Sequence, residues 1–336
     1  MSDYLFPFVD YWWFYATFTA LIVAFLALDL GLFHRTPHVI GFHEASVWTA
    51  IWAALALLFS LGLYEFAAWK FGVATGKQIG LEFLTGYVVE WSLSLDNMFV
   101  FVLVFRYFGT PARFQHRILF FGILGALIFR GVFVFLGAEL LRYGWVVILF
   151  GAFLILSGVR MMCSGEYQIK PEQNLLLRGL RRLLPVATES EGPQFFLWRN
   201  GTLCATPILL TLVFIEATDV LFAVDSVPAI FAVTRKPLVV YTSSVFAILG
   251  LRAMYFLLAG ALARFHLLRY GLAFILIFVG LKMSWLNTSW QGHFPPALSL
   301  FVIVAILVVS IALSLAFPMT PAPRHPPTSK SPHPAS

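Results

Sequence analysis

The chain has 336 residues, of which 60% are hydrophobic and only 11% are charged, and its formal net charge is +6. In soluble domains about a quarter of all residues are charged. This composition therefore excludes a soluble protein and indicates an integral membrane protein. A basic cytoplasmic face near anionic lipid explains the net charge, which therefore does not indicate nucleic-acid binding. The two cysteines, Cys163 and Cys204, are too few for a disulfide framework or a thiolate metal site and are predicted to be packing residues.

Apolar stretches long enough to cross a bilayer occur nine times along the chain. A helix needs about 20 residues to span about 30 Å of hydrocarbon. We therefore predict an all-α polytopic membrane protein with about nine transmembrane helices, in a transmembrane domain over residues 1–317. The predicted spans are 11–33, 46–68, 81–105, 118–140, 143–162, 205–232, 240–262, 268–285 and 297–317.

The first span is predicted to stay in the mature protein as a helix. The residues before it include two acids and no basic residue, which is unlike a cleavable signal peptide. Asp29, near its cytoplasmic end, either snorkels or caps the helix, or contributes to an ion path. In the following loop, His43-Glu44 is similar to the start of a zinc-protease motif, but the second histidine would fall at Val47, which excludes that motif.

The third span contains an unusual polar stretch, Glu90-Trp-Ser-Leu-Ser-Leu-Asp96-Asn97. An ionisable residue at membrane depth is a functional candidate because burial of its charge is costly. A related stretch, from Asp219 to Asp225-Ser226, lies in the sixth span, with Glu216 one turn before it. These two stretches are the predicted functional centre of the protein.

Further matches extend this similarity over three spans each. Arg130 in the fourth span corresponds to Arg252 in the seventh, and the offsets between matched positions stay between 122 and 129. Other matched segments are Leu-Arg-Tyr-Gly at 141–144 and 268–271, and Gly-Val-Arg-Met at 158–161 with Gly-Leu-Lys-Met at 280–283. Three crossings per unit make the second copy enter the membrane from the opposite side. We therefore predict a 3+3 inverted-topology repeat, with units at 81–162 and 205–285. The alternative is chance similarity among apolar residues.

The remaining segments and the basic residues predict the topology. The linker at 163–202 is either an amphipathic helix on the lipid surface or a solvated basic connection. The tail at 318–336 holds seven prolines and is predicted to be disordered. With the N-terminus outside and the C-terminus in the cytoplasm, 14 Lys and Arg fall on the cytoplasmic side and 6 on the outer side, as the positive-inside rule requires.

The charges of the predicted centre indicate which ligand it takes. Five acids, Glu90, Asp96, Glu216, Asp219 and Asp225, lie at membrane depth against two arginines, Arg130 and Arg252, which leaves three surplus negative charges. Protons or a bound cation must balance them, and carboxylate, amide and hydroxyl oxygens suit hard divalent ions. The arginines are interpreted mainly as a brace between the two halves, and a wholly structural ion-pair network is the alternative reading of the acids. Met98 is either a soft metal ligand or a packing residue.

An ideal helix does not bring all these side chains together. At 100° per residue, Glu90, Ser94 and Asn97 share one face while Asp96 lies about 120° away. Asp219 and Ser226 also share a face, with Asp225 displaced. Convergence therefore requires local unwinding, for which Pro228 supplies a reason in the second copy.

The stretches Glu90-Trp-Ser-Leu-Ser-Leu-Asp96-Asn97-Met98-Phe-Val-Phe101 and Glu216-Ala-Thr-Asp219 through Pro228 to Thr234, followed by Phe246 to Phe256, resemble the TerC family and its Alx branch. The resemblance runs from about residue 29 to 286. It implies a bacterial inner-membrane protein linked to manganese export and metal homeostasis, with an association with tellurite resistance. By resemblance, the metal-path residues are Glu90, Asp96, Asn97, Glu216, Asp219 and Asp225, and we add Ser226, Arg130, Arg252, Asp29 and Met98 as supporting residues.

The leading hypothesis is a multi-pass exporter of a divalent cation, manganese first, coupled to protons and without a resident cofactor. An oxyanion would be repelled by the surplus negative charge, so tellurite is interpreted as an indirect association. A membrane-embedded hydrolase would need a metal-protease motif, or a Ser or Cys nucleophile with a histidine at membrane depth. The motif is missing and every histidine lies in a predicted loop or tail, so no enzyme is predicted. The alternative function is a membrane scaffold or stress-response protein that moves no ion.

Overall fold

The computed structural model describes residues 5–28, 41–163, 178–179, 185–186, 192, 194–199, 202–259, 267–286 and 294–317. Within these residues, nine helices are long and apolar enough to cross a membrane, which confirms the predicted all-α polytopic fold. They are α1 (Phe8–Leu28), α2 (Phe42–Phe71), α3 (Val73–Tyr107), α4 (Ala112–Leu140), α5 (Gly144–Cys163), α7 (Pro207–Phe231), α8 (Pro237–Ala259), α9 (Leu268–Leu281) continued by the π-helix η4 (Lys282–Leu286), and α11 (Pro296–Ala316). Asp29, the tail and most of the predicted linker lie outside the described residues.

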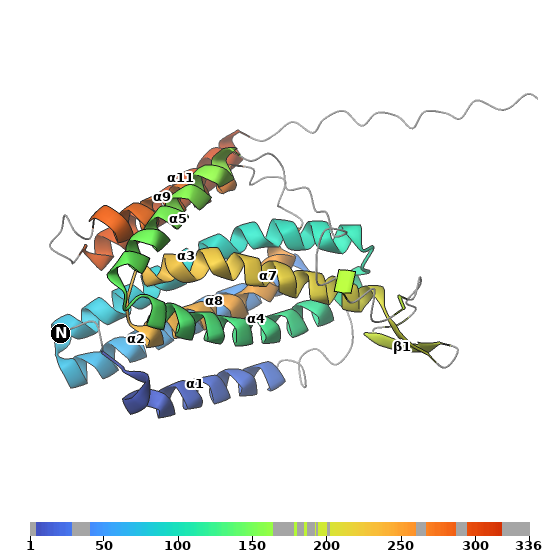
Figure 1. Ribbon diagram of the computed structural model, residues 1–336, viewed down its shortest axis with the longest axis horizontal. Helices are drawn as coiled ribbons and strands as arrows, with labels where there is room; N and C mark the ends of the chain where they lie inside the picture. Colours follow the sequence, from blue (N-terminus) through green and yellow to red (C-terminus); the bar gives the residue numbers. More distant parts are fainter. Residues whose placement is uncertain are drawn as a thin grey trace, which may run out of the picture.

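Helices α3 and α8 form the centre of the bundle and are the most buried of the nine spans. Helices α2, α4 and α7 pack around them. A second group, α5, α9 and α11, lies along one side, and α1 lies on the opposite side (Figure 1). There, Phe18 of α1 contacts the rings of Phe59 in α2 and Phe246 in α8.

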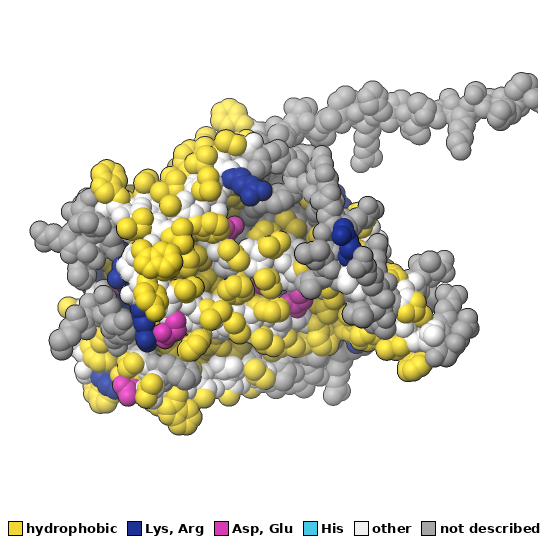
Figure 2. All heavy atoms as spheres, in the orientation of Figure 1, with side chains coloured by type: hydrophobic (Ala, Val, Ile, Leu, Met, Phe, Trp, Pro, Cys, Tyr) yellow, Lys and Arg dark blue, Asp and Glu magenta, His cyan; other side chains and the backbone are white. Residues whose placement is uncertain are grey.

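The outer surface of the bundle is apolar, as a lipid-facing surface requires. Figure 2 shows one face covered largely by hydrophobic side chains, with few charged groups among them. Exposed residues include Phe135, Ile148, Leu156 and Phe301. Because apolar residues point both outward and inward, the hydrophobic pattern alone does not identify which face of each helix is buried.

The turn between α2 and α3 explains why both helices extend beyond their predicted ends. A single residue, Gly72, separates them. Its backbone adopts φ = +94°, a conformation that residues with a Cβ rarely adopt. The chain therefore reverses within one residue. Helix α3 begins at Val73, eight residues before the predicted boundary at 81.

Helices α5 and α9 pack closely through glycines. A Cβ placed on Gly280 would lie 2.7 Å from the Gly151 carbonyl oxygen and 2.9 Å from Ile155 Cγ1. A Cβ on Gly158 would lie 2.7 Å from both the Ala273 carbonyl oxygen and Ile277 Cγ1. Such small-residue contacts let helix backbones approach in membranes. The two sets of contacts are related by one constant sequence offset, since 273, 277 and 280 are each 122 positions after 151, 155 and 158.

A β-hairpin covers the end of the predicted linker and the start of the predicted sixth span. Strands β1 (Phe196–Arg199) and β2 (Thr202–Ala205) pair antiparallel, with Arg199 opposite Thr202. The sequence signal for it, which was missed, is the Asn-Gly pair at 200–201, a strong indicator of a short hairpin. Cys204 is buried in this hairpin, as predicted, but Cys163 is exposed at the end of α5, so a packing role for it was wrong.

Candidate cation site between the central helices

Arg130 connects three of the central helices. Its Nη1 donates to Glu90 Oε2 of α3 at 3.1 Å and to Ser226 Oγ of α7 at 2.7 Å, while Nη2 pairs with Glu90 Oε1. All three side chains are buried. These contacts join α4 to α3 and α7, as the predicted bracing role requires, and a two-pronged guanidinium–carboxylate pair orients both partners.

Asp219 lies beside this pair on the same face of α7 as Ser226. Its buried carboxylate is close enough to interact electrostatically with both Arg130 and Glu90. It also lines a small cavity of about 20 Å³ together with Arg252 of α8. A space of this size accommodates about one water-sized group. Both predicted arginines therefore reach the region of Asp219.

Glu216 extends the row of acids by one turn of α7. Its half-buried carboxylate lies directly against Gly125 of α4, where a Cβ would collide with both carboxylate oxygens. Glu216 and Asp219 interact electrostatically, and among the described residues Glu216 Oε2 is buried without a hydrogen-bond partner. The missing side chain at Gly125 therefore makes room for the Glu216 carboxylate. Its Oε2 is available to a ligand or a proton.

The other predicted residues of α3 are placed less completely. Asn97 is buried in α3, and Met98 is fully buried within the main hydrophobic core, which favours its packing role. Asp96 belongs to the same helix, but its side chain lies outside the described part of the structure. Among the described residues, no three His, Cys, Asp or Glu side chains are placed together as a preformed metal cluster.

Asp225 does not join the other acids, in contrast to the prediction. Its half-buried carboxylate accepts a hydrogen bond of 3.0 Å from Ser157 of α5 and interacts electrostatically with Arg160. The predicted unwinding at Pro228 was wrong, since α7 stays helical through this proline. Without unwinding, the 100° step per residue keeps Asp225 off the face shared by Asp219 and Ser226.

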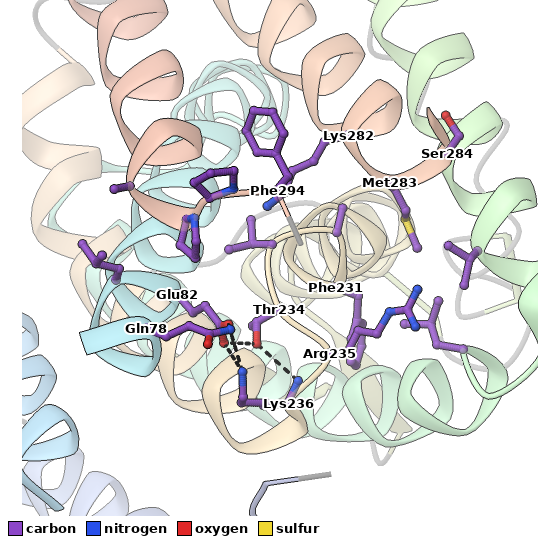
Figure 3. Close-up of a pocket in the computed structure, with 18 of the residues that line it drawn as sticks. Gln78, Glu82, Phe231, Thr234, Arg235, Lys236, Lys282, Met283, Ser284 and Phe294 are labelled. Carbon is purple, nitrogen blue, oxygen red and sulfur yellow. Dashed lines mark hydrogen bonds and ion pairs between the residues drawn. The ribbon is translucent and has the colours of Figure 1, made fainter. Parts of the chain in front are cut away.

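A second group of buried charges was not predicted. Glu82 of α3 accepts from Lys236 Nζ at 2.9 and 2.8 Å, from Thr234 Oγ1 at 2.6 Å, and from Gln78 Nε2 at 2.7 Å. Figure 3 shows these side chains on one side of a cavity, with Lys282 across it. Lys236 and Lys282, counted from the sequence among the loop charges, are both buried. The sequence gives no sign of this burial, because each lysine stands near the end of an apolar run, where a loop residue is expected.

Comparisons with known proteins place the chain among membrane proteins of one family. It is 46% identical over 316 residues, 94% of each chain, to "Uncharacterized membrane protein STKORF319" of Myxococcus xanthus. It is 42% identical over 299 residues to "Putative membrane-bound redox modulator Alx" of Escherichia coli K12, covering 88% of this chain and 92% of that protein. No solved structure matches the chain significantly.

The family model described as "Integral membrane protein TerC family" matches residues 75–320, which include all but the first two residues of α3, the helices from α4 to α11, and both polar stretches. The matched region is most of the chain, and this chain aligns with nearly the full length of both relatives. This chain is therefore a member of the TerC family of integral membrane proteins.

Proposed function

We propose that this chain exports a divalent cation, manganese first, across the bacterial inner membrane in exchange for protons. The observation that carries the proposal is the row of Glu90, Asp219 and Glu216 at the centre of the bundle, with Glu216 Oε2 lacking a hydrogen-bond partner among the described residues. An unbalanced carboxylate at membrane depth is costly, so a proton or a cation must accompany it.

The chemistry of this row favours hard divalent ions as substrates. Carboxylate oxygens from Asp219 and Glu216 are the donors, and among the described residues no cluster of three His, Cys, Asp or Glu side chains offers softer ligands. Such oxygen donors suit Mn²⁺, Mg²⁺ and Ca²⁺ rather than copper or zinc. A substrate site without a preformed three-ligand cluster is consistent with transport, since a carrier must release its ion as well as bind it.

The reciprocal packing of α5 and α9 supports an inverted repeat as the transport architecture. Under an exchange of α3 with α7, α4 with α8 and α5 with α9, the contact of α3 with α8 maps onto that of α7 with α4, and both are extensive. The Gly280 and Gly158 contacts map onto each other in the same way. We propose that these halves move relative to each other around the central acids to give alternating access.

The test is Mn²⁺ flux in proteoliposomes with and without a pH gradient. Asp219→Asn and Glu216→Gln are expected to reduce flux at least about tenfold, since each removes one charged ligand of the substrate. Asp225→Asn, which lies at Ser157 instead, is expected to have a smaller effect. Wild-type flux from Asp219→Asn at equal protein level would overturn this assignment.

The competing functions predict different results in the same assay. A scaffold moves no ion, so absence of flux from the wild-type protein would favour it. The Alx relatives are named for redox modulation, and a thiol-based version of that activity would depend on the free thiols Cys163 and Cys204. Replacement of both by serine is expected to leave Mn²⁺ flux unchanged, whereas loss of flux would favour a thiol-dependent activity.

A further inference from the structure

A cavity of about 1010 Å³ opens at the end of the bundle where α3 begins. It lies between α3, the α4–α5 connection, the α7–α8 connection, η4 and the start of α11 (Figure 3). This is the end that the predicted topology places outside the cell. Five basic residues line it, namely Lys77, Arg142, Arg235, Lys236 and Lys282, and among the described lining residues Glu82 is the one acid.

Glu82 neutralises one of these basic groups and has no oxygen left for another ligand. Oε1 accepts from Lys236 and Gln78, and Oε2 accepts from Lys236 and Thr234. The ion pair is buried, so it forms part of the cavity wall. Arg142 also forms an ion pair of 3.0 Å with the exposed Glu139 of α4, and Arg235 has an interaction partner of its own. The positive excess of the described lining therefore rests on Lys77 and Lys282.

Lys282 is the basic group at depth that this pairing does not satisfy. Its side chain is only 3% exposed and points from η4 into the cavity (Figure 3). The ring of Phe294 lies 5.9 Å from Nζ, and Glu82 is within electrostatic reach. Among the described residues, however, none forms a hydrogen bond or ion pair with its ammonium group. An ammonium group in such a largely buried position gains from an anion that enters the cavity beside it.

We propose that this cavity binds a phosphate-type oxyanion, with Lys282 as the contact at depth and Lys77 as the charged residue at the mouth. Converging positive groups with apolar walls raise the local concentration of anions and repel cations, which separates this site from the central carboxylates. The π-helical turn that carries Lys282 supports a specialised role, because such turns often occur at functional sites. The anion is either free phosphate or the phosphate group of an anionic lipid.

The test measures binding of inorganic phosphate to the full-length protein in an uncharged detergent by isothermal titration calorimetry. A second titration uses a short-chain phosphatidylglycerol, and competition between the two ligands shows whether both take the same site. Binding of either ligand by the wild-type protein is expected, and the stronger one identifies the source of the phosphate group. Binding of neither would overturn the proposal.

Variants assign the binding to this cavity. Lys282→Met removes the charge with little change in volume and is expected to weaken binding at least about tenfold, whereas Lys282→Arg retains it. Glu82→Gln raises the net positive charge of the lining and is expected to strengthen binding. A general loss of structure would weaken binding in both Lys282→Met and Glu82→Gln. Unchanged affinity in Lys282→Met would place the anion elsewhere and refute the proposal, whatever the result for Mn²⁺ flux.

Discussion

At the scale of single residues, the central site depends on which buried acids have a partner and which do not. Arg130 holds Glu90 and Ser226 in a fixed arrangement, whereas Glu216 has an oxygen without a hydrogen-bond partner among the described residues. A fixed pair beside an incompletely satisfied acid combines a rigid frame with a site that gains from binding a cation or proton. The acids are therefore not equivalent, although they look equivalent in the sequence.

The position of Glu216 makes Gly125 a sensitive test of this arrangement. We expect Gly125→Ala to reduce Mn²⁺ flux at least about tenfold, because a Cβ there would displace the carboxylate of Glu216 and a displacement of about 1 Å strongly impairs a binding geometry. Gly122→Ala, one turn earlier in α4, is the matched control. Its Cβ would lie 3.5 Å from Ile215 Cγ2, an ordinary contact, so flux should be retained. Equal flux from both variants would contradict the assigned role of Glu216.

At the scale of helices, the two ends of the bundle differ at positions that the proposed repeat would relate. At one end, Thr234 Oγ1 donates to Glu82 Oε2 at 2.6 Å. At the other end, the hydroxyl oxygens of Thr110 and Thr211 form a hydrogen bond of 3.1 Å. Position 211 follows position 82 by 129, the offset that relates Asp225 to Asp96. The charged cluster around Glu82 thus stands at one end of the bundle, while the neutral pair of Thr110 and Thr211 occupies the corresponding place at the other end. This difference fits a membrane protein whose two ends face different solutions.

The α5–α9 contact supplies a prediction for the packing of the two halves. Gly158→Ala and Gly280→Ala should each lower the free energy of unfolding by about 1–3 kcal/mol, because an added methyl group would meet backbone at 2.7 Å. Reversible unfolding in mixed micelles measures this change. Gly62→Ala is the control, since a Cβ there meets nothing within 4 Å. Clearly different losses in the two test variants would count against the reciprocal packing.

At the scale of the whole molecule, the distribution of basic residues makes the two ends of the bundle different. Five of the six basic residues that the predicted topology assigns to the outer side line the cavity beside η4. Basic residues at this mouth lower the local concentration of cations there.

This orientation is testable with the natural cysteine at the end of α5. In a Cys204→Ser background, the exposed Cys163 should react with a membrane-impermeant maleimide only after the cells are permeabilised, because the predicted topology puts it in the cytoplasm. A cysteine introduced at the exposed Lys77 of a Cys163→Ser variant should react in intact cells. Labelling of Cys163 in intact cells would reverse the assigned topology.

The sequence by itself determined the membrane location, the nine spans and the candidate acids, because hydrophobic length and the cost of buried charge depend on composition and position alone. It also predicted Arg130 as a brace, since a buried arginine among acids has few other stable arrangements. Only the tertiary structure decided which acids meet. Asp219 turns toward Arg130 while Asp225 turns toward Ser157, and Lys236 and Lys282 are buried although they were counted among loop charges. The physical reason is that these helices are apolar on most faces, so the orientation of each is set by the helices it packs against.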